Sequence, residues 1–186
     1  MQSAVEALIA KQEITEVVYR YCRGVDRFDR EMVRDCYWPE ATDEHGSFSG
    51  TRDEYISWLF ERMLPRYSWS QHFIGNVLID QLDLVAGRAK CESYGQSRHH
   101  RPAPSPEAAR PEHNLISGFR YVDDFARRDG EWRIARRICP LEWVRIDTSS
   151  TFFEAPPAHR RGTRDRSDPA YWSYDEFHPW TVEQAE

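Results

Sequence analysis

The sequence lacks several features that would assign it to a particular class of protein. No apolar run is long enough to cross a bilayer, so we expect no membrane span. There is no excess of basic residues: 25 Lys and Arg stand against 31 Asp and Glu, and the net charge of −6 does not favour a nucleic-acid partner. No glycine-rich run that would hold a phosphate group is present.

Cysteine is also scarce. The four cysteines, Cys22, Cys36, Cys91 and Cys139, are widely spaced, and no two of them form a C-x-x-C pair. This spacing indicates reduced thiols rather than disulfides. The N-terminus begins with a helical pattern instead of a signal peptide. Together, these features predict a cytoplasmic protein.

The first third of the chain has the hydrophobic spacing of helices. This spacing covers residues 4–26 and 30–37, and the sequence from Thr51 to Glu54 reads as a capping box that opens a third helix. Residues 39–50, between the second and third helices, are expected to form a loop. We therefore predict three helices before the chain changes its pattern.

From residue 70 onward the apolar residues alternate as they do in strands. Four strands are predicted, at 70–79, 84–100, 115–128 and 131–146, with a Pro-rich loop at 101–112. Helices followed by strands predict an α+β fold, in which the helices cover one face of an antiparallel sheet. Long strands curl, so the expected shape is a cone-shaped α+β barrel that encloses a small-molecule pocket.

Residues 1–147 are predicted to form this domain, and residues 148–186 a C-terminal extension. The extension ends in the aromatic run AYWSYDEFHPW, whereas disordered segments are usually poor in aromatic residues. We therefore expect part of it to pack on the barrel or on a partner subunit. A sheet face left open by the helices further predicts a homodimer or homotrimer.

The opening helix brings two reactive groups toward the interior. Its apolar stripe includes Ile14 and Val17, and ends with the phenol of Tyr21 and the carboxylate of Asp26. A carboxylate at the end of a buried stripe needs a partner. His72, at the start of the first strand, is a candidate because a carboxylate would orient its imidazole as a base. A buried histidine bonded to a backbone carbonyl is the alternative.

Four short motifs carry a resemblance to a known family. These are YRYCRGVDRFD, WPEA, S-x-HFIGNV and GEWRIARR. Together they resemble the SnoaL-like branch of the NTF2-like superfamily over residues 5–146. This branch contains scytalone dehydratase, bile acid 7α-dehydratase and hexachlorocyclohexane dehydrochlorinase. The resemblance implies the cone-shaped barrel, and a lyase that needs no cofactor.

The resemblance also implies roles for three residues. Asp26 and His72 match the Asp–His pair that serves as the base in these lyases. Tyr21 matches the tyrosine of the bile acid dehydratase pattern, a position at which the dehydrochlorinase has lysine. The expected catalytic residues are therefore Asp26, His72 and Tyr21.

Strand alternation suggests one more catalytic group. Trp132, Ile134 and Arg136 share a face of the last strand, so Arg136 is predicted to point into the cone, where it would stabilise an oxyanion. A bulge would place Arg137 there instead. In the strand at 84–100, alternation leaves open whether the face of Tyr94 or the face of Cys91 is turned inward.

Histidine clustering does not predict a metal site. His99, His100 and His113 lie on either side of the Pro-rich loop, but adjacent histidines on a strand point to opposite faces. At most one of the adjacent pair would join His113. We therefore expect no metal, and the resemblance implies that no cofactor is needed.

The resulting prediction is a lyase that acts on a hydroxylated aromatic or polycyclic small molecule. The substrate contacts are expected to include the aromatic residues Tyr94, Trp58, Phe73 and Phe119. The group lost is water, or formaldehyde from a lignin-derived diarylpropanediol, an outcome that rests on similarity to the diarylpropane lyases of lignin breakdown. Two alternatives remain: an isomerase like ketosteroid isomerase, and a non-catalytic ligand-binding or dimerisation module.

Overall fold

The computed structural model describes residues 4–103, 112–148, 160–173 and 176. Most of the predicted Pro-rich loop and most of the aromatic end of the extension lie outside the described residues. The three predicted α-helices are present as α1 (Ala4–Asp26), α2 (Arg30–Asp35) and α3 (Arg52–Trp58), with two strands between α2 and α3. A π-helical segment (Leu59–Met63) and a 3-10 turn (Leu64–Arg66) continue from α3.

The predicted capping box opens α3. The Thr51 hydroxyl accepts from the backbone N–H of Glu54, and the Glu54 carboxylate accepts from the backbone N–H of Thr51 at 2.8 Å. Such reciprocal bonds satisfy donors that a helix start leaves unpaired. The short helix α2 ends at Asp35, two residues earlier than predicted, because Tyr37 already belongs to a strand.

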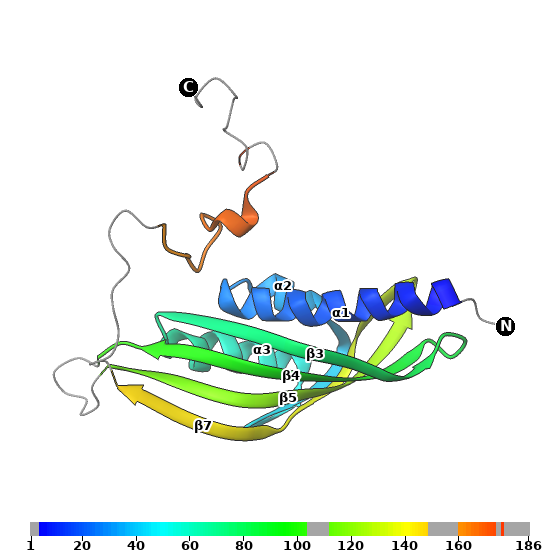
Figure 1. Ribbon diagram of the computed structural model, residues 1–186, viewed down its shortest axis with the longest axis horizontal. Coiled ribbons are helices and arrows are strands. Elements are labelled where there is room, and N and C mark those ends of the chain that lie inside the picture. Colours follow the sequence, from blue (N-terminus) through cyan, green and yellow to red (C-terminus); the bar gives the residue numbers. More distant parts are fainter. Residues whose placement is uncertain (1–3, 104–111, 149–159, 174–175, 177–186) are drawn as a thin grey trace.

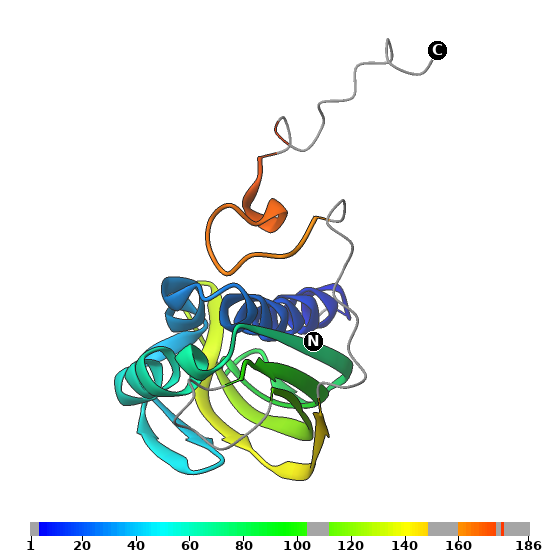
Figure 2. The same ribbon diagram turned by 90° about the vertical axis from the view of Figure 1, so that its left-hand side faces the viewer.

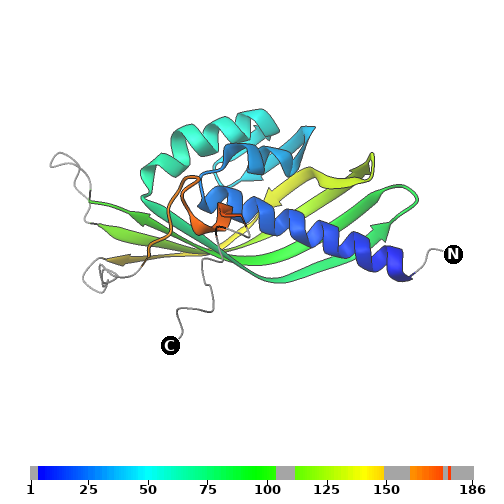
Figure 3. The same ribbon diagram turned by 90° about the horizontal axis from the view of Figure 1, so that it is seen from above.

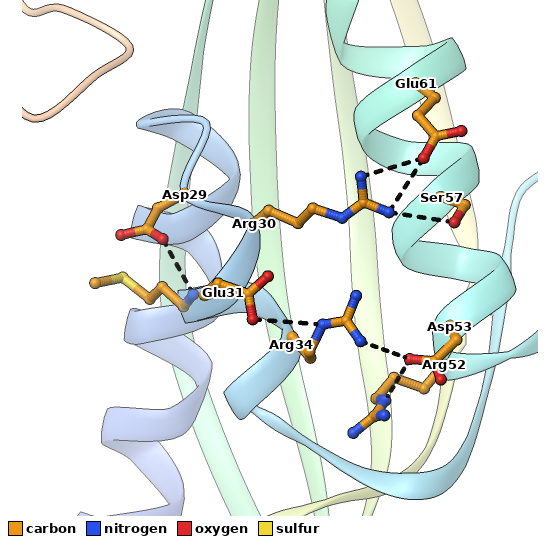
Figure 4. Close-up of polar contacts among 9 residues, drawn as sticks. Asp29, Arg30, Glu31, Arg34, Arg52, Asp53, Ser57 and Glu61 are labelled. Atoms are coloured by element: carbon orange, nitrogen blue, oxygen red, sulfur yellow. Dashed lines mark hydrogen bonds and ion pairs between the residues drawn. The ribbon is translucent and has the colours of Figure 1, made fainter.

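The helix α2 is fastened to its neighbours by polar contacts, which Figure 4 shows in close-up. Asp29 caps its start by accepting from the backbone N–H of Met32 at 3.2 Å. Arg30 donates to Glu61 at 3.1 Å, and Arg34 donates to Asp53 at 3.2 Å. These contacts join α2 to the helical segments that begin with α3.

One seven-stranded sheet forms the second layer of the fold. The strands run in the order β2-β1-β6-β5-β4-β3, and β7 pairs with β5. Their bounds are β1 (Tyr37–His45), β2 (Phe48–Thr51), β3 (Trp69–Asp83), β4 (Arg88–Arg101), β5 (His113–Arg128), β6 (Glu131–Cys139) and β7 (Leu141–Thr148). Pro140 separates β6 from β7, where a single strand was predicted.

The loop predicted at residues 39–50 is wrong, because this stretch forms β1 and β2. In addition, β1 runs parallel to β6, so the sheet is mixed rather than purely antiparallel. The pairing of β1 with β6 shifts between Tyr37 and Thr42, around Pro39, which has no N–H to donate. Proline and the many charged residues in this stretch hide the alternation that marks a strand.

The helices cover the concave face of the curled sheet, and α1 lies along β3 (Figures 1 and 2). Figure 3 shows the same layer from above. The fully buried side chains of Ile14, Val17 and Val18 on α1 belong to one core together with Tyr55 of α3 and Ile134 of β6. The predicted α+β class, with helices packed on a curled sheet, is therefore confirmed.

The opposite face of the sheet carries exposed apolar side chains. They include Phe73, Tyr94 and Trp143, of which Phe73 is 70% exposed. The predicted homodimer or homotrimer stays a prediction. Across the described ranges, no helix is both long and apolar enough to span a membrane.

Candidate active site

Asp26, the last residue of α1, places its carboxylate beside β3. Val17, Val18 and Val25 anchor the helix in the core, so the position of Asp26 is fixed by packing. The Asp26 side chain is 11% exposed and the His72 side chain 7%. The pair therefore lies within the covered face, as the sequence predicted.

Two hydrogen bonds join Asp26 to His72. Asp26 Oδ1 lies 2.7 Å from His72 Nδ1, and Asp26 Oδ2 accepts from the His72 backbone N–H at 2.7 Å. A proton on Nδ1 makes the first contact a donated hydrogen bond and leaves Nε2 with its lone pair. Nε2 has no hydrogen-bond partner within the described part of the chain. Asp26 therefore fixes the orientation of the imidazole and directs Nε2 away from the carboxylate.

The contacts with His72 also set the ionisation of Asp26. Burial alone would raise the pKa of the carboxyl group, but the charge of His72 and its side-chain and backbone hydrogen bonds outweigh burial, and the pKa of Asp26 is lowered. A carboxylate that stays ionised supports a proton on the imidazole it faces. This is the relationship that an orienting carboxylate needs.

The imidazole of His72 is bordered by two further rings. His99 lies edge-on with its ring centroid 5.4 Å away, and the Phe119 centroid lies 6.0 Å away. Burial, together with the charge of His72, lowers the pKa of His99 to about 3. His99 is therefore neutral near pH 7. The predicted contact Phe119 does lie at the site.

The ring of Phe119 packs against a strand that has no side chain at that point. A Cβ atom on Gly95 would lie 2.5 Å from the Phe119 ring. Gly95 belongs to the face of β4 that also carries Cys91, Ser93 and His99, and this face is turned toward the helices. The question that alternation left open is thus decided in favour of the face with small residues.

Tyr21 lies deeper in the same core. Its hydroxyl shares a hydrogen bond with the Tyr55 hydroxyl, and its ring meets Tyr121 edge-on at 5.5 Å. Tyr121 in turn lies 4.7 Å from Phe119, which connects Tyr21 to the rings around His72. Burial raises the pKa of Tyr21, so its phenol keeps its proton at neutral pH.

Arg137, not Arg136, points inward, so the prediction for Arg136 is wrong. Arg136 is 52% exposed at its side chain and pairs with Glu44 at the surface. Arg137 is fully buried and holds Asp123 through Nε and Nη2, both at 2.7 Å. Its guanidinium carbon lies 4.2 Å from the centre of the Tyr21 ring.

The inward turn of Arg137 has a local cause. In the pairing of β5 with β6, Asp124 faces Arg136 and Phe125 faces Ile134, so one step on β5 matches two steps on β6. The extra residue, Ala135, is a bulge that reverses the alternation. The sequence had allowed for such a bulge but did not locate it.

The structure places the other three predicted substrate contacts in different parts of the molecule. Tyr94 is 47% exposed and Phe73 70% exposed on the outer face, so neither points into the cone. The pocket at that face has a volume of about 640 Å³ and is lined by Phe73, Tyr94 and Trp143. Trp58 stacks on Tyr55 at 6.0 Å, on the far side of the core from His72.

Two polar residues in the core near Tyr55, His45 and Asp43, were not predicted. Tyr55 approaches His45 Nδ1 at 3.3 Å, and His45 lies 3.3 Å from Asp43 Oδ1. Burial disfavours the charged imidazole, but the Cys139 sulfur and the Asp43 carboxylate outweigh it and raise the pKa of His45 to about 10. Because residues 39–50 were expected to form a loop, neither His45 nor Asp43 was expected to point into the core.

A groove of about 400 Å³ opens beside the Asp–His pair. It is lined by residues of α1 and β3, including Cys22, Asp26, His72 and the predicted contact Phe73. This volume is within the range of small-molecule sites. Among the described residues, no group of three or more His, Cys, Asp or Glu could hold a metal ion.

Comparison with known families decides the relationship of the chain. A model of the SnoaL-like domain matches residues 6–138, which include Tyr21, Asp26, His72 and Arg137. The chain belongs to the SnoaL-like family. A comparison with curated proteins found no match.

Solved structures share the SnoaL-like fold with this chain at low identity. Hexachlorocyclohexane dehydrochlorinase (LinA) type 2 is 16% identical, with a TM-score of 0.70 over 84% of this chain and 100% of the other. LinA type 3 from Novosphingobium barchaimii is 15% identical, with a TM-score of 0.68 over 83% and 100%. A scytalone dehydratase-like protein from Novosphingobium aromaticivorans is 20% identical, with a TM-score of 0.65 over 86% and 99%. These likenesses show that the SnoaL-like chain has the fold of NTF2-like proteins.

Proposed function

We propose that this SnoaL-like protein is a cofactor-independent lyase in which His72, oriented by Asp26, is the general base. The observation that carries the proposal is that both oxygens of Asp26 bind His72, at 2.7 Å each. This fixes the imidazole and leaves Nε2 available to remove a proton from the substrate. Similar structures named for dehydrochlorinase and dehydratase activities support the same class of reaction.

Tyr21 is the proposed acid partner. Its raised pKa keeps the phenol protonated, and its hydrogen bond with Tyr55 fixes the direction of the hydroxyl. Arg137, rather than the predicted Arg136, is the arginine that points inward. Its proposed role is to position Tyr21. It packs on the ring of Tyr21 while it is bound to Asp123, so it holds the phenol rather than the substrate.

Two forms of elimination fit these roles. In dehydration, His72 takes a proton from carbon, the electron pair forms a double bond, and the neighbouring hydroxyl leaves as water with a proton from Tyr21. In the second form, His72 takes a proton from a terminal hydroxyl. That carbon then leaves as formaldehyde, and the electrons of the broken carbon–carbon bond form the double bond as a second hydroxyl departs as water with a proton from Tyr21.

The substrate is proposed to be a hydroxylated aromatic or polycyclic molecule. The Phe119 ring lies 6.0 Å from that of His72 and 4.7 Å from that of Tyr121, so two aromatic rings lie next to the proposed base. Aromatic walls of this kind hold flat apolar groups by stacking and area burial. The small size of the groove, about 400 Å³, limits the part of the substrate held beside the pair.

An isomerase mechanism with a carboxylate as the base is less well supported. Such a base needs a free carboxylate oxygen, whereas both oxygens of Asp26 accept hydrogen bonds from His72. A non-catalytic binding module predicts instead that the pair can be replaced without loss of any reaction.

The test is a mass-spectrometric screen without added cofactor. Purified protein is incubated with hydroxylated aromatic and polycyclic compounds, including diarylpropanediols, beside the variants His72→Ala and His100→Ala. His100 is the matched control, because it stacks on Trp69 at 5.4 Å, away from the pair. We expect a product lighter by water, or by water and formaldehyde, that His72→Ala does not form and His100→Ala does.

Two other outcomes of this screen would contradict the lyase proposal. A reaction that survives His72→Ala but not Asp26→Asn would favour the isomerase-like base and contradict the proposal. No conversion of any compound, with binding of some, would favour the non-catalytic module.

A further inference from the structure

Residues 160–173 lie against the C-terminal end of α1, close to the proposed active site (Figure 3). Arg27, directly after α1, pairs with Asp168 at 2.8 Å. Asp29, which follows α1, accepts from the Tyr171 hydroxyl at 3.0 Å and pairs with Arg166 at 3.1 Å. These contacts fix the segment on the helix that carries Asp26.

The segment places Arg164 in a partly buried position. Its Nη1 donates to the backbone carbonyls of Leu64, at 3.3 Å, and of Tyr67. Its guanidinium carbon lies 4.7 Å from the centre of the Phe28 ring. Nη1 is therefore hydrogen-bonded to the backbone, and one face of the guanidinium plane is covered by Phe28.

The other edge of the Arg164 guanidinium has no partner. Nε and Nη2 are buried, and neither forms a hydrogen bond with any described residue. This is the same edge with which Arg137 holds the carboxylate of Asp123, at 2.7 Å from each nitrogen. An unpaired buried guanidinium is costly, and this fork geometry matches a carboxylate.

The nearby carboxylates of the protein are already engaged. Asp26 is bound to His72, Asp168 to Arg27, and Asp29 to Arg166 and Tyr171. Arg164 forms no ion pair in the described part of the chain. The counter-ion that its free edge fits must therefore come from outside these residues.

Arg164 is also close to the reacting groups. Its charge acts on both Asp26 and His99. Arg164 also donates to the backbone of Tyr67, whose ring is tilted against that of His99 with the centroids 4.8 Å apart. His99 Nδ1 is buried without a described partner as well. Unused polar groups thus gather beside the Asp–His pair.

We propose that Arg164 binds a carboxylate of the substrate through its Nε–Nη2 edge, so that the substrate is an aromatic acid. This inference deepens the proposed lyase function and assigns specificity to a residue of the C-terminal extension. Arg164 is a binding residue in this scheme, and His72 remains the base.

The test compares the binding of cinnamate with that of its neutral isostere cinnamamide, by isothermal titration calorimetry. Arg160→Gln is the matched control for Arg164→Gln, because it removes the same charge from the same segment at an exposed side chain that lies over Trp172 rather than on α1. The wild type and Arg160→Gln are expected to bind the acid about 10-fold or more tightly than the amide, and Arg164→Gln to lose this preference.

A second variant, Arg164→Lys, separates loss of the carboxylate contact from misfolding. Arg164→Lys keeps the charge but lacks the fork, and it is expected to lose most of the preference. Cinnamate preference that persists in both variants, absence of preference in the wild type, or failure of the wild type to bind either compound would overturn the proposal. If the two Arg164 variants also lost the affinity for cinnamamide equally, Arg164 would be a structural latch instead.

The binding test is independent of catalysis. His72→Ala is expected to keep the preference for the acid, because the carboxylate contact does not involve the base. A screen without turnover, combined with a preference that only the Arg164 variants lose, would retain this inference and reject the lyase. Turnover that requires His72, without any preference for acids, would do the reverse.

Discussion

Asp26 accepts two hydrogen bonds from His72, one from the imidazole and one from the backbone N–H, both at 2.7 Å. The end of α1 and the start of β3 are therefore joined by the same contacts that orient the proposed base. Because one residue supplies both donors, the imidazole cannot rotate away without weakening the link between helix and sheet.

The first prediction concerns Asp26→Asn. This change keeps the size of the side chain but removes the charge that supports the proton on Nδ1, so turnover should fall by about 10²- to 10⁴-fold. Substrate affinity should change little, which separate measurements of kcat and Kd would show. An unchanged kcat would contradict the role given to the pair.

The same variant tests the lowered pKa of Asp26. A carboxyl group with a depressed folded pKa stabilises the protein above its unfolded value of about 4, and this stability is lost as pH falls through the folded pKa. The stability gap between wild type and Asp26→Asn should be present at pH 7 and shrink below pH 4. Urea unfolding across this range measures it, with the exposed Asp80→Asn as a control that shows no such gap.

The second prediction compares two adjacent arginines. Arg137→Met leaves Asp123 as an unpaired buried carboxylate and should cost about 3–5 kcal/mol of unfolding free energy. Arg136→Met breaks only a surface pair with Glu44 and should cost about 0–1 kcal/mol. Chemical denaturation of both variants measures the difference, and similar losses would contradict the position of the bulge.

These arginines also show where prediction from sequence stops. The change from helical to strand spacing was sufficient for the α+β fold, and the position of Asp26 at the end of an apolar stripe was sufficient to suggest that it meets a histidine. A bulge, by contrast, is a property of two paired strands. Nothing in the sequence of β6 marks Ala135 as the extra residue.

The face of β4 and the strands β1 and β2 illustrate the same limit. Alternation separated Tyr94 from Cys91 but gave no sign of which side the helices cover. Gly95 faces Phe119 because β4 pairs with β5, a strand that lies elsewhere in the sequence. Pro39 and its charged neighbours hid a strand that is stabilised by its pairing with β6 rather than by its own composition.

The third prediction concerns Gly95→Ala. The new methyl group would lie 2.5 Å from the Phe119 ring and force it toward His72, at a cost of about 1–3 kcal/mol. Ligand affinity should fall together with stability. Gly75→Ala is the matched control on the neighbouring strand, because its Cβ meets no atom closer than 3.7 Å. Equal effects of the two changes, measured by thermal unfolding and calorimetric titration, would place Phe119 outside the binding site.

The fourth prediction follows from the neutral state of His99. Its folded pKa of about 3 lies below the unfolded value of about 6.5, so the unfolded chain takes up a proton first as pH falls. Stability is complete above pH 6.5 and decreases toward pH 3. His99→Gln should remove part of this decrease, which urea unfolding at pH 7, 5 and 4 would measure. A variant with the same acid sensitivity as the wild type would contradict the burial of a neutral imidazole.

The fifth prediction has the opposite sign and concerns His45. Its folded pKa of about 10 lies above the unfolded value of about 6.5, so the folded chain keeps the proton as pH rises. The stabilisation is complete below pH 6.5 and is lost as pH rises through 10. His45→Gln should therefore be less stable than the wild type at pH 6, with a gap that closes toward pH 10.

Denaturant unfolding of both proteins from pH 6 to 10 measures this gap. Titrations that the two proteins share, such as those of their tyrosines, cancel in the difference, so the remaining slope belongs to His45 and its contacts with Asp43 and Cys139. A gap that stays constant over this range would show that His45 is neutral in the folded protein. Tyr55, which lies 3.3 Å from His45 Nδ1, would then be the donor in that contact rather than the acceptor.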